Sequence, residues 1–192
     1  MSIVTEGAVA GPGERRSPGL AALFDALESD GRHSILDLGP AAGRRLRILG
    51  RFATQVRFVD LLARAGPGTA WDEGLGALRP NPARPYDVVL AWDVLDRLGA
   101  EERLALVARL AAVTAPRARL YALAAREGTG SAAGEFVLVD RDRIAERPAD
   151  GEAAAHRPIL PAELERALAP FDVVNAYMLR TGAREYVAMK RE

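Results

Sequence analysis

The sequence predicts an α/β protein built on a doubly wound, mostly parallel sheet. Short apolar segments alternate with longer ones in which apolar residues recur every three or four positions, the patterns of strands and helices. YDVVLAW at residues 86–92 is almost continuously apolar, which is typical of a strand buried on both faces of a parallel sheet. The final segment, 171–190, contains two strand-like runs around Thr181 and Gly182, and so short a turn joins only antiparallel strands.

Length and composition favour one soluble domain. The chain has 192 residues, 26 basic and 26 acidic, and no cysteine. We expect a flexible segment at 1–16, a single domain at 17–192 and a cytoplasmic location. We expect neither a nucleic-acid nor a membrane partner, because neither basic nor acidic residues gather into a block. Without cysteine there are no disulfides or thiolate nucleophiles, and His33 and His156 have no partner at metal-ligand spacing, so no metal site is predicted.

In the first part of the chain the pattern is helix, strand, helix, strand. Ser17 is the expected N-cap of the first helix, with Pro18 at its first position and Gly31 beyond its end. The segments that follow are a strand at 34–39, a helix at 41–53 with Leu46, Ile48 and Leu49 as its apolar residues, and a strand at 55–60.

The second part continues the alternation with one weak stretch. Residues 61–86 are rich in glycine and proline and leave room for one short helix or a strand pair. A polar excursion at 126–158 contains one strand-like piece, EFVLVD. The regular elements expected here are a strand at 86–92, a helix at 100–115, a strand at 118–124, a helix at 160–170 and the final hairpin.

The turn in ILDLGPAAGRR, residues 35–45, is the first candidate site. It leads from a strand into a helix at the carboxyl end of the sheet, where doubly wound proteins bind ligands. Gly39 and Gly43 allow close approach to the backbone, and the helix that follows offers free N–H groups. Asp37 is costly to bury unless something pairs with it. A ligand ammonium would serve, although a plain tight turn is the alternative.

ILDLGPAAG, VRFVD, YDVVLAWDVLDRL, APRARLYALA and the final hairpin together resemble class I S-adenosylmethionine-dependent methyltransferases, over nearly all of residues 35–190. The resemblance implies a Rossmann-like sheet of about seven strands with the last antiparallel, and S-adenosylmethionine as cofactor. Asp37, Gly39, Ala41 and Gly43 match the family's acidic residue and glycine-rich turn, with Ala41 in place of the central glycine. Asp60 matches the acidic residue that grips the ribose hydroxyls, which suits a carboxylate that accepts two hydrogen bonds.

Two further aspartates are cofactor-binding candidates. Asp72, beside Trp71, stands where an adenine-contacting acid is expected, with a surface loop as the alternative. Asp93 follows the strand at 86–92 and either bridges cofactor and substrate or caps the next helix. No general base is predicted, because Asp96-Arg97 stands where many relatives have histidine, and a lone loop histidine such as His156 is more often solvated.

The predicted function is a methyltransferase that acts on an unidentified substrate, a small molecule in preference to a protein. Methyl transfer from a sulfonium needs alignment above all, so the missing base does not exclude catalysis. One alternative is a methyltransferase-like binding protein without catalysis. Another is a nicotinamide-nucleotide oxidoreductase, although GPAAG lacks the Gly-x-Gly-x-x-Gly spacing of that class.

Overall fold

The computed structural model describes residues 13–27, 31–61, 71–81, 83–124, 134–148 and 159–192. Its strands are β1 (Glu14–Arg16), β2 (His33–Asp37), β3 (Ala53–Phe58), β4 (Tyr86–Trp92), β5 (Thr114–Ala124), β6 (Gly134–Asp140), β7 (Arg143–Pro148), β8 (Phe171–Met178) and β9 (Arg184–Lys190). Its helices are α1 (Pro18–Asp25), α2 (Gly43–Leu49), α4 (Trp71–Ala77), α5 (Val94–Arg97), α6 (Ala100–Val113) and α7 (Pro161–Ala167).

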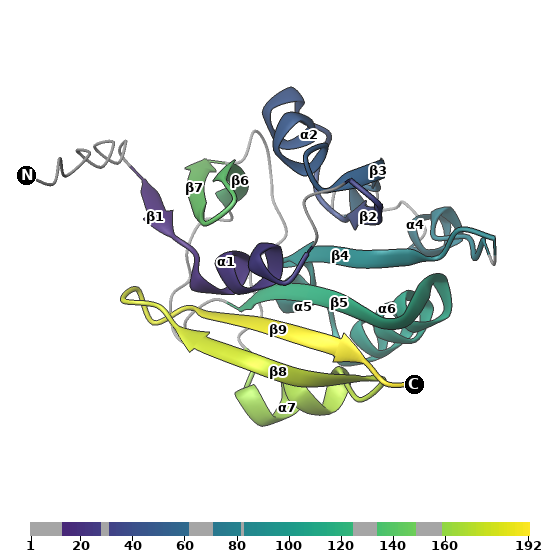
Figure 1. Cartoon of the computed structure of the whole chain (residues 1–192). Helices are drawn as coiled ribbons and strands as arrows, with labels where there is room; N and C mark the ends of the chain where they lie inside the picture. Colours follow the sequence, from purple (N-terminus) through teal and green to yellow (C-terminus); the bar gives the residue numbers. More distant parts are fainter. Residues whose placement is uncertain (1–12, 28–30, 62–70, 82, 125–133, 149–158) are drawn as a thin grey trace, which may run out of the picture.

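The main sheet has six strands in the order β3-β2-β4-β5-β9-β8 (Figure 1). Strands β3, β2, β4 and β5 are mutually parallel, and β9 runs antiparallel to both of its neighbours. Strand β8 is therefore parallel to β2, as predicted, and the antiparallel strand lies between β5 and β8. The hairpin turn closes with the Leu179 N–H donating to the Ala183 carbonyl at 2.8 Å, and Gly182 adopts a φ of +86° that favours glycine.

Helices cover both faces of this sheet, which confirms the doubly wound class (Figure 1). Alternate residues of β4 divide between two cores: Val89 and Ala91 face one, and Val88 and Leu90 face the other. The first core is completed from α5, α6 and α7, and the second from α1, α2 and the small sheet described below. Because β4 is buried on both sides, its apolar run leaves no face for solvent.

Helix α1 is fixed to the sheet through buried polar groups. Ser17 is its N-cap, as predicted, with Oγ accepting from the Leu20 N–H at 3.2 Å. Glu185 of β9, fully buried, accepts from the Gly19 N–H at 2.7 Å and from the Tyr121 hydroxyl at 3.1 Å. A Cβ on Gly19 would lie 2.9 Å from the Glu185 Oε2, so this approach requires glycine.

A second, three-stranded antiparallel sheet has the order β1-β7-β6. The prediction of one strand in the excursion was incomplete, because β7 pairs with β6 from Gly134↔Pro148 to Asp140↔Arg143. Residues 14–16, placed in the expected flexible segment, form β1 against β7. We call β1, β7 and β6 the small sheet. Its Phe136, Leu138 and Ile144 pack in the core under α1 and α2.

The remaining differences are local. Among the described residues the main sheet has six strands where about seven were expected, and the described part of 61–85 contributes none. Of the three apolar residues expected in the helix at 41–53, Leu46 is 50% exposed, and the buried stripe of α2 is Arg45, Ile48 and Leu49. In the described parts, no helix is both long and apolar enough to cross a membrane.

Candidate functional site

The glycine turn, residues 39–43, lies at the carboxyl end of β2, which is the centre of three parallel strands ordered β3-β2-β4. From β2 the chain passes through α2 to β3 on one side, and then crosses to β4 on the other. Such a reversal marks the ligand-binding edge of a doubly wound sheet. The ends of β2, β3 and β4 bring Asp37, Asp60 and Asp93 to this edge. The glycine turn and these three aspartates therefore lie along one edge of the sheet.

Asp37 is completely buried and already has partners within the protein. Its Oδ1 accepts from the Gly39 N–H at 2.9 Å and from the Trp92 indole N–H at 2.7 Å, and lies 3.3 Å from Arg45 Nη1. Its Oδ2 is buried without a hydrogen-bond partner among the described residues. Burial raises the pKa of Asp37, while the Arg45 guanidinium and the two N–H donors act to lower it.

Arg45 is the residue that sequence reasoning missed. Its side chain is 1% exposed, and besides Asp37 it donates from Nη1 to the Pro40 carbonyl at 3.1 Å and from Nη2 to the Phe136 carbonyl of β6. Its guanidinium carbon also lies 4.6 Å from the centre of the Trp92 ring, a cation–π contact. One signal was present in the sequence: Arg45 stands three and four residues before Ile48 and Leu49, on the stripe that α2 buries.

Trp92 completes the cluster from β4. It is buried, and its ring also meets that of Tyr121 edge-on at 5.8 Å. Its φ of +50° is uncommon for a residue with a side chain, and such a conformation persists only when its surroundings enforce it. Here the indole is held between the Asp37 carboxylate and the Arg45 guanidinium.

The two turn glycines play different parts. A Cβ on Gly39 would lie 2.5 Å from Arg45 Nη1 and 3.3 Å from Asp37 Oδ1, so the close approach that glycine allows is used by an internal side chain. A Cβ on Gly43 would meet nothing within 4 Å. Ala41, between them, is exposed. The absent Cβ therefore matters sterically at Gly39, and the methyl of Ala41 projects from a position open to solvent.

Asp60 lies two residues beyond the end of β3 and is half-buried. Its neighbour Val59 donates an N–H to the Asp37 carbonyl at 2.8 Å, which ties this strand end to the glycine turn. The Asp60 charge also contributes to raising the pKa of Asp37. Asp60 is thus close to the turn yet not fully buried.

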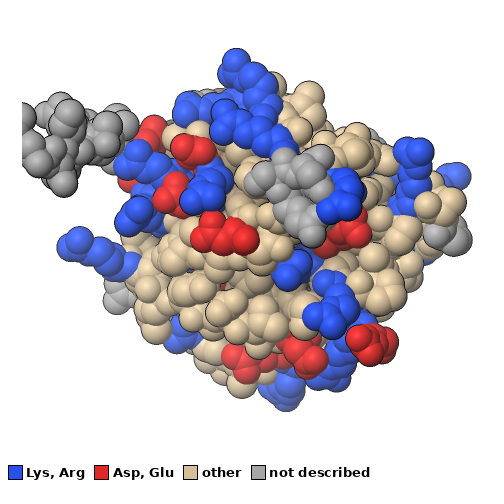
Figure 2. All heavy atoms as spheres, viewed as in Figure 1, with Lys and Arg blue, Asp and Glu red and all other residues tan. Residues whose placement is uncertain are grey.

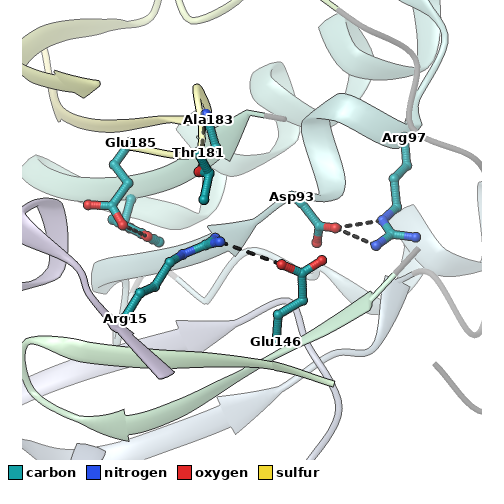
Figure 3. A network of polar contacts seen from close by, with 8 residues as sticks. Arg15, Asp93, Arg97, Glu146, Thr181, Ala183 and Glu185 are labelled. Atoms are coloured by element: carbon teal, nitrogen blue, oxygen red, sulfur yellow. Dashed lines mark hydrogen bonds and ion pairs between the residues drawn. The ribbon is translucent and has the colours of Figure 1, made fainter. Parts of the chain in front are cut away.

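Asp93 occupies the N-cap position of α5 but makes no capping hydrogen bond with its side chain. Instead Asp93 Oδ2 accepts from Arg97 Nε at 2.8 Å and from Arg97 Nη2, and both side chains are buried. Figure 3 shows this pair together with a second pair, Arg15 and Glu146 of the small sheet, whose Nη1 and Oε2 lie 3.5 Å apart. Side chains of both charges therefore gather at the carboxyl edge of β4.

The other predicted candidates fall outside this cluster or outside the described residues. Asp72 belongs to α4, so its backbone is helical and not the surface loop that was the alternative; its side chain is outside the described parts, as is all of His156. The surface of α2 is more basic than the sequence suggested, because Arg44, Arg47 and Arg51 are exposed three and four residues apart and basic atoms gather over this helix (Figure 2).

No protein-family model and no curated protein matches the chain, but solved structures do. The chain has the fold of class I S-adenosylmethionine-dependent methyltransferases. A 1,6-didemethyltoxoflavin-N1-methyltransferase from Burkholderia thailandensis is 19% identical, with a TM-score of 0.58, over 91% of this chain and 77% of that one. The amino pentose methyltransferase CalS10 from Micromonospora echinaspora, with S-adenosylmethionine bound, is 17% identical, with a TM-score of 0.57, over 90% and 89%. A methyltransferase from Clostridium acetobutylicum is 11% identical, with a TM-score of 0.60, over 91% of each chain.

Proposed function

We propose that the protein is an S-adenosylmethionine-dependent methyltransferase that acts on a small molecule. The observation that carries the proposal is the meeting of the glycine turn, Asp60 and Asp93 at the carboxyl ends of three adjacent parallel strands. The structural neighbours support the substrate class, since one is named for 1,6-didemethyltoxoflavin and another for an amino pentose. The antiparallel position of β9 disfavours the nicotinamide alternative.

The site fits the two halves of this cofactor differently. Asp60 is half-buried at the end of β3, and in this proposal its carboxylate would accept hydrogen bonds from the ribose. At the other end of the turn Asp37 would hold an ammonium, but Arg45 already holds that carboxylate. When bound, the cofactor supplies an electrophilic methyl group, and the protein's part is to align the methyl group with a nucleophile.

A methyltransferase-like binding protein without catalysis is the second candidate. The observation that favours it is the internal pairing of Asp37 with Arg45, since this pairing leaves a cofactor ammonium without its expected partner. Measurements of cofactor binding and turnover distinguish the two candidate functions, because an inactive protein of this kind need not bind S-adenosylmethionine.

Calorimetric titration with S-adenosylmethionine and S-adenosylhomocysteine tests the proposal. We expect wild-type protein to bind both, and Asp60→Ala to bind them about tenfold to hundredfold more weakly, the cost of a charge-assisted contact to the ribose. Asp25→Ala, which removes an exposed carboxylate that pairs with Arg141 at the surface, is the matched control and should leave affinity unchanged. Equal affinities of wild type and Asp60→Ala would remove Asp60 from the site, and no binding by wild type would favour the inactive candidate.

A further inference from the structure

The position beside Asp37 that an incoming cation would take is filled by Arg45. The guanidinium donates to the Asp37 carboxylate, the Pro40 carbonyl and the Phe136 carbonyl. Two of these hydrogen bonds come from Nη1 and the third from Nη2, so the cationic head of Arg45 spans all three acceptors. The structure thus satisfies internally the group for which a ligand ammonium was expected.

Arg45 occupies this position by close steric contact as well as by its charge. A Cβ on Gly39 would lie only 2.5 Å from Arg45 Nη1, so the guanidinium packs directly against the turn at this residue. Gly43, at the other end of the turn, has open space where a Cβ would project. The guanidinium therefore covers the turn on the Cβ side of Gly39, whereas the corresponding side of Gly43 is open.

Arg45 also joins the turn to the small sheet. Its Nη2 donates to the Phe136 carbonyl of β6, and Arg15 of β1 lies with its guanidinium carbon 5.2 Å from the Phe136 ring centre. The group that fills the cation position is thus the same group that fastens β6 over the turn. Withdrawing Arg45 would loosen β6 and expose Asp37 together.

We propose that Arg45 determines the specificity of the glycine turn: it takes the cation position at Asp37 and Gly39, so an amino-acid ammonium on an adenosine ligand adds no affinity while Arg45 is in place. This inference rests on the proposed function and concerns the same site. The ligand class it favours is an adenosine that carries a sulfonium or thioether group, with or without an amino-acid end. A merely structural ion pair would have no such effect on ligand preference.

The experiment compares two ligands that differ in the amino-acid end. S-Adenosylhomocysteine carries it and 5′-methylthioadenosine lacks it, and calorimetry gives the affinity ratio for each variant. In wild type we expect the two affinities to agree within about threefold. In Arg45→Met, which frees Asp37, S-adenosylhomocysteine should gain about tenfold to hundredfold over 5′-methylthioadenosine, the effect of one charge-assisted contact.

Two variants control for indirect effects. The double variant Asp37→Asn/Arg45→Met removes both charges, so its ratio should return to the wild-type value. Arg47→Met changes an exposed arginine of the same helix and should leave the ratio unchanged. A wild-type preference above tenfold for S-adenosylhomocysteine, or a ratio that does not rise in Arg45→Met, would overturn the inference while leaving the proposed function intact.

Binding of neither ligand by any variant would count against the proposed function instead. The structural premise, that Arg45 fastens β6 over the turn, is then tested by amide hydrogen exchange in β6, which should be faster in Arg45→Met than in wild type or Arg47→Met. Unchanged exchange would overturn it. Should Arg45→Met fail to fold, the same exchange measurement is made on the double variant, which buries no charge at positions 37 and 45.

Discussion

Two buried carboxylates lie on opposite parts of the sheet and are satisfied in different ways. Asp37, at the glycine turn, is held by a buried guanidinium and two N–H groups. Glu185, under α1, is held by the Gly19 N–H and the Tyr121 hydroxyl, both neutral. Burial raises the pKa of both. The difference shows which carboxylate could exchange its partner. The cation beside Asp37 can be replaced by another cation, whereas the donors to Glu185 belong to the fold.

The largest expected effect follows from removing the cation. Arg45→Ala leaves Asp37 buried without its ion pair and opens space beside Trp92, and we expect the free energy of unfolding to fall by about 3–5 kcal/mol. Urea denaturation measures it. Arg44→Ala, exposed on the same helix, should change stability by less than about 0.5 kcal/mol. Similar small losses in both variants would mean that the Asp37–Arg45 pair contributes little.

The second-largest expected effect concerns the Trp92 indole N–H, a neutral donor to Asp37. Trp92→Phe removes the indole N–H that lies 2.7 Å from Asp37 Oδ1 but keeps an aromatic ring for Arg45. A hydrogen bond to a charged group is worth about 1.5–3 kcal/mol, so we expect a loss of stability in that range. Thermal and urea unfolding measure it, and an unchanged stability would show that Arg45 alone satisfies the carboxylate.

Much of the fold could be predicted because its signals are local. The apolar run of β4, the Ser17 cap, the strand-turn-helix at Asp37 and the final turn each depend on neighbouring residues. The position of Asp60 at the sheet edge followed from the end of one strand pattern. These features were visible without knowing what they pack against.

What the sequence did not reveal depends on distant partners. Arginine is normally a surface residue, and Arg45 is buried because Phe136, 91 positions away, offers it a carbonyl. Strand β7, RIAERP, is polar and forms through pairing with β6 and β1. The sequence identified Asp37 as a carboxylate in need of a partner but placed that partner in the ligand.

A smaller effect tests the network around Glu185. Ser17→Ala removes the N-cap of α1 and a hydroxyl 3.4 Å from that of Tyr121, and we expect a loss of about 1 kcal/mol. Ser34→Ala is the control, since the Ser34 Oγ is buried without a hydrogen-bond partner in the described parts of the chain. Equal stabilities of the two variants would contradict the capping role.

The smallest effect is a change in pH dependence. Because burial raises the pKa of Glu185 above its ordinary value of 4.5, the folded protein holds this proton more tightly than the unfolded chain. Wild type should therefore lose stability relative to Glu185→Gln as the pH rises from about 4.5 through the folded pKa. Thermal unfolding of both proteins across this window measures the difference, and a constant difference would mean that Glu185 does not titrate with folding.

Strand β9 is the last strand in the chain and yet an inner strand of the sheet, paired with β5 on one side and β8 on the other. During synthesis, the edge of β5 that pairs with β9 stays unpaired until β9, some sixty residues later, has been made. Strand β8 likewise has no neighbour in the sheet until β9 is present. The residue that anchors α1, Glu185, also arrives with it. The N-terminal half can order locally, but completion of the sheet is a late event on the ribosome, with an unpaired strand edge exposed until residues 184–190 have emerged.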